Sequence, residues 1–365
     1  MAPFRDSLHP REQSRVLAAC LYQSGNAAQN DHQHEIAMTT ATVSPAETSR
    51  SLKSRILGAP SAGPLLVLIG FCLIFALSNP RFLATHNLSI ILQQTVIIGV
   101  LAIGQTLVIL TAGIDLAVGA ICVLGTIVAG KLVNLGYDPV LSMGFAILLC
   151  TAAGLAAGGL VSGLRLPPFI VTLGILGILT AALRLISAGG AFPVRDPFLA
   201  WTGNTMKLGG FVLTYGVLIM FALYAVVWYL LNQTKWGRHV YAIGNNTEAA
   251  RLVGIPVRRH LLSVYLLAGL IYGIAAWLAL GRIPNADPNA MQSANLDSIT
   301  AVVIGGTSLF GGRGGLIGTL IGALIVGVLR NGLTLAGIDP LWQDLVTGIL
   351  VIIAVALDQM SRRKN

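Results

Sequence analysis

The sequence has little charge and few aromatic side chains. Only 10% of its 365 residues are Asp, Glu, Lys or Arg, whereas charged residues make up about a quarter of a typical soluble domain. Hydrophobic residues reach 55% and the mean hydropathy is +0.78. This composition excludes an ordinary soluble protein and predicts an all-α, polytopic membrane protein. The 42 glycines fit closely packed membrane helices, because small residues let helix backbones approach one another.

The sequence also lacks the motifs of the common catalytic and metal sites. A glycine-rich run covers 305–315, but Leu316 follows it where a nucleotide-binding loop requires Lys and then Ser or Thr. No group of carboxylates and histidines gathers near one end of the apolar spans. The cysteines are too scattered for a metal site or a redox pair: Cys20, Cys72, Cys122 and Cys150. We therefore expect a non-catalytic chain without metal or cofactor, in which any ATP hydrolysis belongs to a partner.

The first 58 residues differ from the rest. They are rich in Ser, Thr, Gln, Asn and Ala and hold no apolar run long enough to fold or to span a membrane. We expect a mostly disordered cytoplasmic tail over 1–58 and a transmembrane domain over 59–365. Met38 is an alternative start of translation, which N-terminal sequencing would test.

Apolar runs then follow in regular succession, and about 20 residues suffice for a helix to cross the hydrocarbon. The pattern predicts about ten transmembrane helices. They cover approximately 61–79, 88–110, 114–134, 139–162, 168–188, 209–231, 260–281, 296–310, 314–333 and 341–358. The eighth run is short and interrupted by glycine, which makes it the weakest candidate for a full crossing.

The net charge of +9 is interpreted as membrane topology and not as nucleic-acid binding. If both termini are cytoplasmic, thirteen basic residues face the cytoplasm: Arg50, Lys53, Arg55, Arg165, Lys235, Arg238, Arg251, Arg258, Arg259, Arg313, Arg362, Arg363 and Lys364. Five lie on the opposite side: Arg81, Lys131, Arg195, Lys207 and Arg282. Since basic residues concentrate in cytoplasmic loops, the distribution favours this orientation.

A polar segment at about 244–255 interrupts the apolar spans on the side that we assign to the cytoplasm. Asn246 or Thr247 is suited to cap a short helix, with Glu248 near its positive end and Gly254 at its close. Pro256 prevents the helix from continuing. A polar helix displayed by a membrane protein indicates a contact with another protein.

Several polar side chains lie within or between the spans. Asp115 stands between glycines, where its carboxylate either caps the following helix or serves the pathway of a transported solute. Gln94 and Gln105 are eleven residues apart, about three helical turns, so they share one helix face. That face either lines a polar cavity or hydrogen-bonds to neighbouring helices. A proton relay is disfavoured because Asp115 has no obvious titratable partner. Thr307 and Ser308 are further candidates for the pathway.

Four motifs carry a resemblance to a known family. They are GIDLAVG at 113–119, PPFIVTLG at 167–174, AIGNNTEAARLVGI at 242–255 and AVVIGGTSLFGGRGGLIGTLIGALIVGVLRNGL at 301–333. From about residue 60 to 365, the chain resembles the permease subunits of ABC-type monosaccharide importers, the group that carries ribose, xylose, galactose and fructose.

The resemblance implies a permease homodimer in the bacterial inner membrane, with two ATP-binding subunits and a periplasmic sugar-binding protein as partners. It places a coupling helix, which docks on the ATP-binding subunit, at Glu248, Ala249, Ala250, Arg251 and Gly254. The loops at about 189–208 and 282–295 would then meet the binding protein. Their docking charges would come from Arg195, Asp196, Lys207, Arg282, Asp287 and Asp297.

Two alternatives remain open. An ion-coupled secondary transporter has similar hydropathy, but it favours ionisable pairs buried in the membrane. Related ABC permeases also carry other small polar solutes, such as nucleosides and amino acids. Specificity in such systems rests largely with the binding protein, so the sequence of the permease does not name the solute.

Overall fold

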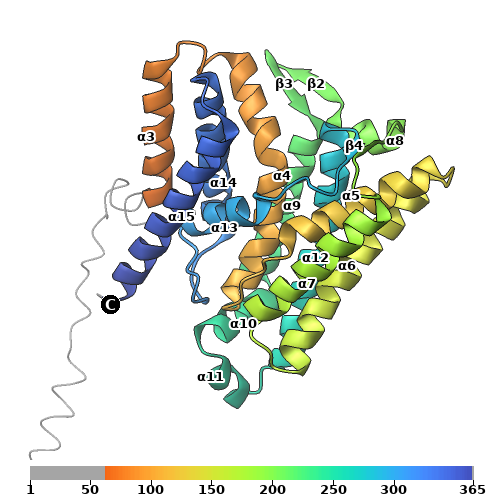
Figure 1. Cartoon of the computed structure of the whole chain (residues 1–365). Coiled ribbons are helices and arrows are strands. Elements are labelled where there is room, and N and C mark those ends of the chain that lie inside the picture. Colours follow the sequence, from red (N-terminus) through yellow and green to blue (C-terminus); the bar gives the residue numbers. More distant parts are fainter. Residues whose placement is uncertain (1–61, 364–365) are drawn as a thin grey trace, which may run out of the picture. The chain divides into compact units, whose positions relative to one another are not determined.

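The computed structural model describes residues 62–363, all within one compact unit. The expected tail over 1–58, Met38 and Cys20 lie outside the described residues. Ten apolar helices coincide with the ten expected spans (Figure 1). They are α3 (Ala62–Ser78), α4 (Thr85–Leu110), α5 (Val118–Asn134), α6 (Pro139–Gly163), α7 (Pro168–Ile186), α9 (Tyr215–Gln233), α12 (Val257–Arg282), α13 (Ala294–Ile304), α14 (Leu316–Leu335) and α15 (Pro340–Arg363).

Seven of these helices are long and apolar enough to cross a membrane. Helices α3 and α5 have 17 residues each, which is the lower limit for a crossing of about 30 Å of hydrocarbon. Helix α13 has only 11 residues, or about 17 Å at 1.5 Å per residue, and is too short. The eighth expected crossing is therefore a half-length helix followed by the glycine-rich loop 305–315, and ten complete helical crossings are not confirmed.

Helix α4 lies between two groups of helices. It contacts α13 and α14, which pack with α3 and α15, and it contacts α12, which packs with α5 and α6 (Figure 1). Glycines bring α6 and α12 together, since a side chain on Gly154 would collide with the main chain at Tyr265 and Gly269. The interior is consequently built on close backbone contact between α6 and α12, with α7 and α15 on the outside.

The predicted helical membrane fold is confirmed, and two small pairs of strands accompany the helices. Strands β2 (Thr205–Leu208) and β3 (Phe211–Thr214) form a hairpin, turning at Gly209 and Gly210 with φ of +54° and +90°. The expected helix at 209–231 therefore begins only at Tyr215. Strands β1 (Phe192–Pro193) and β4 (Asn285–Ala286) also pair, and helix α8 (Pro197–Ala200) follows β1.

The strands gather at one end of the helices, and two short helices, α10 (Lys235–Asn245) and α11 (Thr247–Leu252), lie at the other (Figure 1). We call these the strand end and the α11 end. The glycine-rich breaks between α4 and α5 and between α13 and α14 meet each other, because Gly312 N–H donates to the Leu110 carbonyl at 3.0 Å. Both lie at the α11 end, because Gly244 of α10 lies against Leu110 and Gly312.

Candidate functional site

Helix α11 forms where the sequence predicts a short polar helix. The side chain of Asn246 caps it by accepting a hydrogen bond from Ala249 N–H at 3.0 Å. Gly254 has φ of +85° and ends it, and Ile255 N–H returns to the Ala250 carbonyl at 3.0 Å. This left-handed closure favours glycine because glycine has no Cβ. The predictions for Asn246 and Gly254 are confirmed, whereas Thr247 is the first helical residue.

The side chains of α11 divide into an inner and an outer face. Ala250 is 4% exposed and packs against Ile243 and Val257. The expectation that it docks on a partner therefore does not hold, and its small side chain instead lets α11 lie close against its own chain. Ala249 is exposed, as are Glu248 and Arg251. These two charges lie 3.8 Å apart, and such an exposed pair contributes little stability.

Two outward-facing residues escaped the sequence analysis. Leu252 and Val253 are 87% and 77% exposed at the end of α11. Their side chains are the large apolar ones that α11 and its closing turn offer to a partner. The signal in the sequence was an apolar pair directly before the glycine that ends a polar helix.

Helix α10, which the sequence analysis also missed, connects α11 to α12 and to the glycine loop before α14. Trp236 Nε1 donates to Ser263 Oγ of α12 at 2.8 Å, and the rings of His239 and His260 approach to 3.0 Å between nitrogens. Tyr241 donates from its hydroxyl to the Gly314 carbonyl at 3.0 Å. Burial raises the pKa of the Tyr241 phenol, so this donor keeps its proton. The apolar residues of α10 at 236, 240 and 243 recur at helical spacing, and this pattern was the signal in the sequence for the helix.

A main-chain junction joins α10 to both glycine breaks. Gly244 of α10 lies so close to the Leu110 carbonyl and the Gly312 N–H that a Cβ at position 244 would overlap both. Gly311 and Gly312 have φ of +80° and +72°. A Cβ on Gly311 would approach Ala112 N to 2.7 Å. The end of α4, the end of α10 and the glycine loop before α14 therefore meet backbone to backbone.

Asp115 lies in the break between α4 and α5 and is 2% exposed. Its carboxylate accepts a hydrogen bond from Ala117 N–H at 2.8 Å. Because α5 begins at Val118 with Ala117 at its cap position, Asp115 closes the turn before the helix and does not cap the helix itself. Thr172 of α7 holds the same turn, accepting from Leu116 N–H and donating to the Ile114 carbonyl, both at 3.1 Å. The sequence analysis did not identify Thr172.

The predicted pathway residues do not line an open channel in this conformation. Gln105 is 0% exposed, and neither its amide nitrogen nor its oxygen has a hydrogen-bond partner among the described residues. Gln94 is half-buried. Thr307 and Ser308 are 1% and 4% exposed, and Ser308 Oγ donates to Asp358 of α15 at 3.0 Å. Their proposed role in the pathway stays a prediction, one that requires the helices to move apart.

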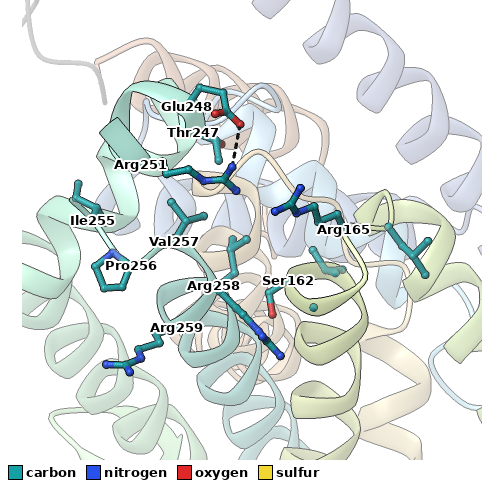
Figure 2. A pocket seen from close by; sticks show the side chains of 14 residues that line it. Ser162, Arg165, Thr247, Glu248, Arg251, Ile255, Pro256, Val257, Arg258 and Arg259 are labelled. Carbon is teal, nitrogen blue, oxygen red and sulfur yellow. Dashed lines mark ion pairs between the residues drawn. The ribbon is translucent and has the colours of Figure 1, made fainter. Parts of the chain in front are cut away.

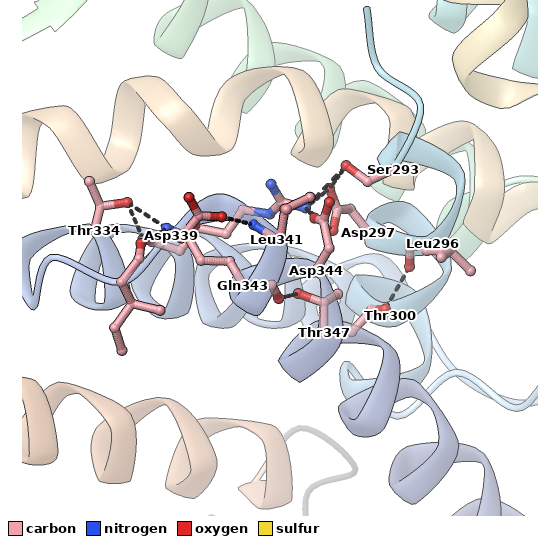
Figure 3. A network of polar contacts seen from close by, with 12 residues as sticks. Ser293, Leu296, Asp297, Thr300, Thr334, Asp339, Leu341, Gln343, Asp344 and Thr347 are labelled. Atoms are coloured by element: carbon pink, nitrogen blue, oxygen red, sulfur yellow. Dashed lines mark hydrogen bonds and ion pairs between the residues drawn. The ribbon is translucent and has the colours of Figure 1, made fainter.

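Asp297, expected as a docking charge in a loop, is instead buried in α13. Its side chain is 3% exposed and forms an ion pair with Arg330 of α14 at 2.8 Å (Figure 3). Arg330 also pairs at 3.0 Å with Asp344 of α15, which is half exposed. We call Asp297, Arg330 and Asp344 the ion triad. It joins the half-length helix to two neighbours, so Asp297 is not free to meet a binding protein.

Two other expected docking charges hold local turns. Asp196 accepts from Phe198 and Leu199 N–H at 2.9 and 3.0 Å, which caps α8, and Asp287 accepts from Asn289 N–H at 2.8 Å. These contacts use one carboxylate oxygen in each case and leave the other for a partner.

Comparisons with known proteins agree on one class of protein, the permease components of transport systems. The family described as the permease component of the branched-chain amino acid transport system matches residues 87–355. The chain is 46% identical to the fructose import permease protein of Rhizobium meliloti over 312 residues, which cover 84% of this chain and 87% of that protein.

Two relatives from Escherichia coli K12 are similar over comparable lengths. The ribose import permease protein is 38% identical over 327 residues, covering 88% of this chain and 99% of the relative. The galactose/methyl galactoside import permease protein is 33% identical over 324 residues, covering 84% and 96%. No solved structure matches the chain significantly.

Proposed function

The chain belongs to the family of branched-chain amino acid transport system permease components, and from that premise we propose that it is the membrane-spanning subunit of an ATP-driven importer of a monosaccharide. The observation that carries the choice of solute is its identity of 33–46%, over more than four fifths of its length, to permease proteins named for fructose, ribose and galactose. It is a multi-pass protein of the bacterial membrane, and the proposal makes it the non-catalytic subunit.

Helix α11 is the proposed contact with an ATP-binding subunit. It offers exposed Glu248, Ala249 and Arg251 together with the apolar Leu252 and Val253. A mixture of apolar side chains with surrounding charge is typical of specific protein interfaces. The proposal places α11 and both termini on the cytoplasmic side, and the strand end toward a solute-binding protein. A second copy of the chain completes the solute pathway.

The main-chain junction supplies a route for coupling. If ATP-driven closure of the partner displaces α11, α10 moves with it, because Asn246 is shared as the end of one helix and the cap of the next. Gly244 then displaces Leu110 at the end of α4 and the glycine loop before α14. The movement thereby reaches α4, which carries the predicted pathway residue Gln105, and the glycine loop, which carries Thr307.

Reconstitution tests the proposal against its alternatives. The chain, its co-purifying subunits and a soluble binding protein are assayed in liposomes for uptake of labelled fructose, ribose and galactose, with a nucleoside and a branched-chain amino acid as controls. Sugar uptake that requires ATP on the side of the liposome membrane where the ATP-binding subunits lie supports the importer. Ionophores should leave this uptake unchanged. Uptake driven by an ion gradient without ATP would replace it with a secondary transporter.

Glu248→Lys tests the role of α11 itself. Reversal of this charge should leave the chain's own packing intact, because the Glu248 side chain is 75% exposed and its ion pair with Arg251 contributes little stability. We expect normal membrane insertion and loss of ATP-dependent uptake. Lys235→Glu on α10, also exposed and polar, is the matched charge reversal away from α11. Equal loss in both variants would contradict a specific contact at α11.

A further inference from the structure

A basic pocket of about 630 Å³ opens beside α11 (Figure 2). Its walls are the end of α6, the turn into α7, α11 and the start of α12. Four arginines and one glutamate line it: Arg165, Arg251, Arg258, Arg259 and Glu248. Only Arg251 has an ion pair, with Glu248, among the described residues. The pocket thus holds an excess of three positive charges that the described part of the chain does not neutralise.

The polar groups of the pocket converge from separate elements. Arg251 and Arg165 extend toward one another from α11 and from the turn after α6, whereas Arg259 extends away from them (Figure 2). The Arg258 guanidinium lies over the end of α6, since a Cβ on Gly163 would be 3.6 Å from its Nη2. The hydroxyl of Ser162 is buried at the same wall without a hydrogen-bond partner among the described residues. A ligand bound at this wall would supply the missing hydrogen-bond partner.

Arg165 also has an unfavourable backbone conformation. Its φ is +56°, in the left-handed region that costs a residue with a Cβ about 1 kcal/mol or more. Glycine would occupy this turn without strain. An arginine at a position suited to glycine indicates that its side chain has a role other than forming the turn.

The position of the pocket indicates which class of ligand fits it. It lies where α6 ends and where α7 and α12 begin, which is the depth of the lipid headgroups for helices that cross a bilayer. Its wall continues through Leu166 into an exposed apolar surface formed by Leu164, Phe169 and Ile170, exposed by 66%, 51% and 52%. Basic side chains above an apolar wall match a phosphate group with acyl chains attached.

We propose that this pocket binds the phosphate headgroup of an anionic phospholipid. Arg165 and Arg258 are its principal ligands, and Ser162 donates a hydrogen bond to a phosphate oxygen. The start of α12 adds the positive end of a 26-residue helix. Because Arg251 belongs to α11, the bound headgroup also helps to hold α11 against the membrane. This site is independent of which solute the chain transports.

Native mass spectrometry of the full-length chain in mild detergent tests the proposal. Phosphatidylglycerol and phosphatidylcholine are titrated separately, and inorganic phosphate is added alone in a third arm. We expect at least tenfold tighter binding of phosphatidylglycerol than of phosphatidylcholine. Equal binding of the two lipids overturns the proposal. Competition by free phosphate at the concentration of the lipid overturns a lipid site in favour of a simple anion site.

Variants locate the binding. Arg165→Gln combined with Arg258→Gln should weaken phosphatidylglycerol binding about 25-fold, at about fivefold for each arginine. Arg238→Gln, an exposed arginine of α10 outside the pocket, removes the same charge and should leave binding unchanged. Arg165→Gly relieves the backbone strain and should bind lipid weakly while unfolding at the same or a higher temperature. Unchanged lipid binding in these variants, with loss of a co-purifying ATP-binding subunit, would assign the pocket to a protein partner and overturn the proposal.

Discussion

The ion triad makes a quantitative prediction because its two carboxylates share one arginine but differ in burial. The Asp297 side chain is 3% exposed and that of Asp344 is 50% exposed, at 2.8 and 3.0 Å from Arg330 Nη2. Asp297→Ala and Asp344→Ala each remove one negative charge and one ion pair. Each variant keeps Arg330 and the other carboxylate, so the largest difference between the two variants is the burial of the carboxylate that is lost.

We expect the two substitutions to differ by about 2 kcal/mol or more. Breaking a buried ion pair from one side typically costs 3–5 kcal/mol, and the lower figure of about 3 kcal/mol applies here because Arg330 keeps Asp344 and is 26% exposed. An exposed pair contributes about 0–1 kcal/mol. The variant Asp297→Leu with Arg330→Leu leaves no charge buried alone, and should recover most of the loss.

Thermal unfolding of the purified full-length chain, followed by tryptophan fluorescence in detergent, measures the difference. A gap of about 2 kcal/mol corresponds to about 5 °C between the transitions of Asp297→Ala and Asp344→Ala. Equal unfolding temperatures would refute the reasoning, because they would mean that burial does not govern the strength of these pairs. A double variant that is less stable than Asp297→Ala would refute the assignment of the cost to an unpaired buried charge.

Three further predictions concern close packing, the helix cap and the buried carboxylate. Gly154→Ala should lower the unfolding temperature markedly, because its Cβ would meet the main chain of α12, whereas Gly159→Ala on the same helix has open space and should be neutral or stabilising by about 1 kcal/mol; a tolerated Gly154→Ala would argue against the α6–α12 contact. Asn246→Ala should weaken α11 by about 1 kcal/mol and reduce stimulated ATPase activity, with Asn245→Ala as its exposed control. Asp115→Asn keeps an acceptor for Ala117 N–H, so it should preserve folding, and loss of uptake in a folded variant would assign the charge to the solute pathway.

The helical spans were predictable because each is a long apolar run, and the membrane leaves a chain few alternatives to a helix. The exception is α13, which ends at Ile304. The glycines after Ile304 marked this run as the weakest candidate for a crossing, but they did not show where the helix would stop. The β2–β3 hairpin was missed because Phe211–Thr214 is as apolar as the helix that follows it. The adjacent glycines at 209 and 210 were the available signal, and they were read as part of a span.

The ends of α11 were predictable from local chemistry, since Asn246 and Gly254 act through their own backbone neighbours. Its faces were not. Adjacent helical residues point about 100° apart, and only the packing against Val257 decides that Ala250 is inside and Ala249 outside. The ion triad was out of reach for the same reason, because Asp297 and Arg330 are 33 residues apart in sequence.

The main-chain junction at Gly244 has a consequence for the proposed transport cycle. Contacts between side chains absorb small displacements by changing rotamers, but a contact between two backbones has no rotamers to change. In the proposed cycle the end of α4, the end of α10 and the glycine loop therefore move together as one body, or the hydrogen bond between Leu110 and Gly312 breaks.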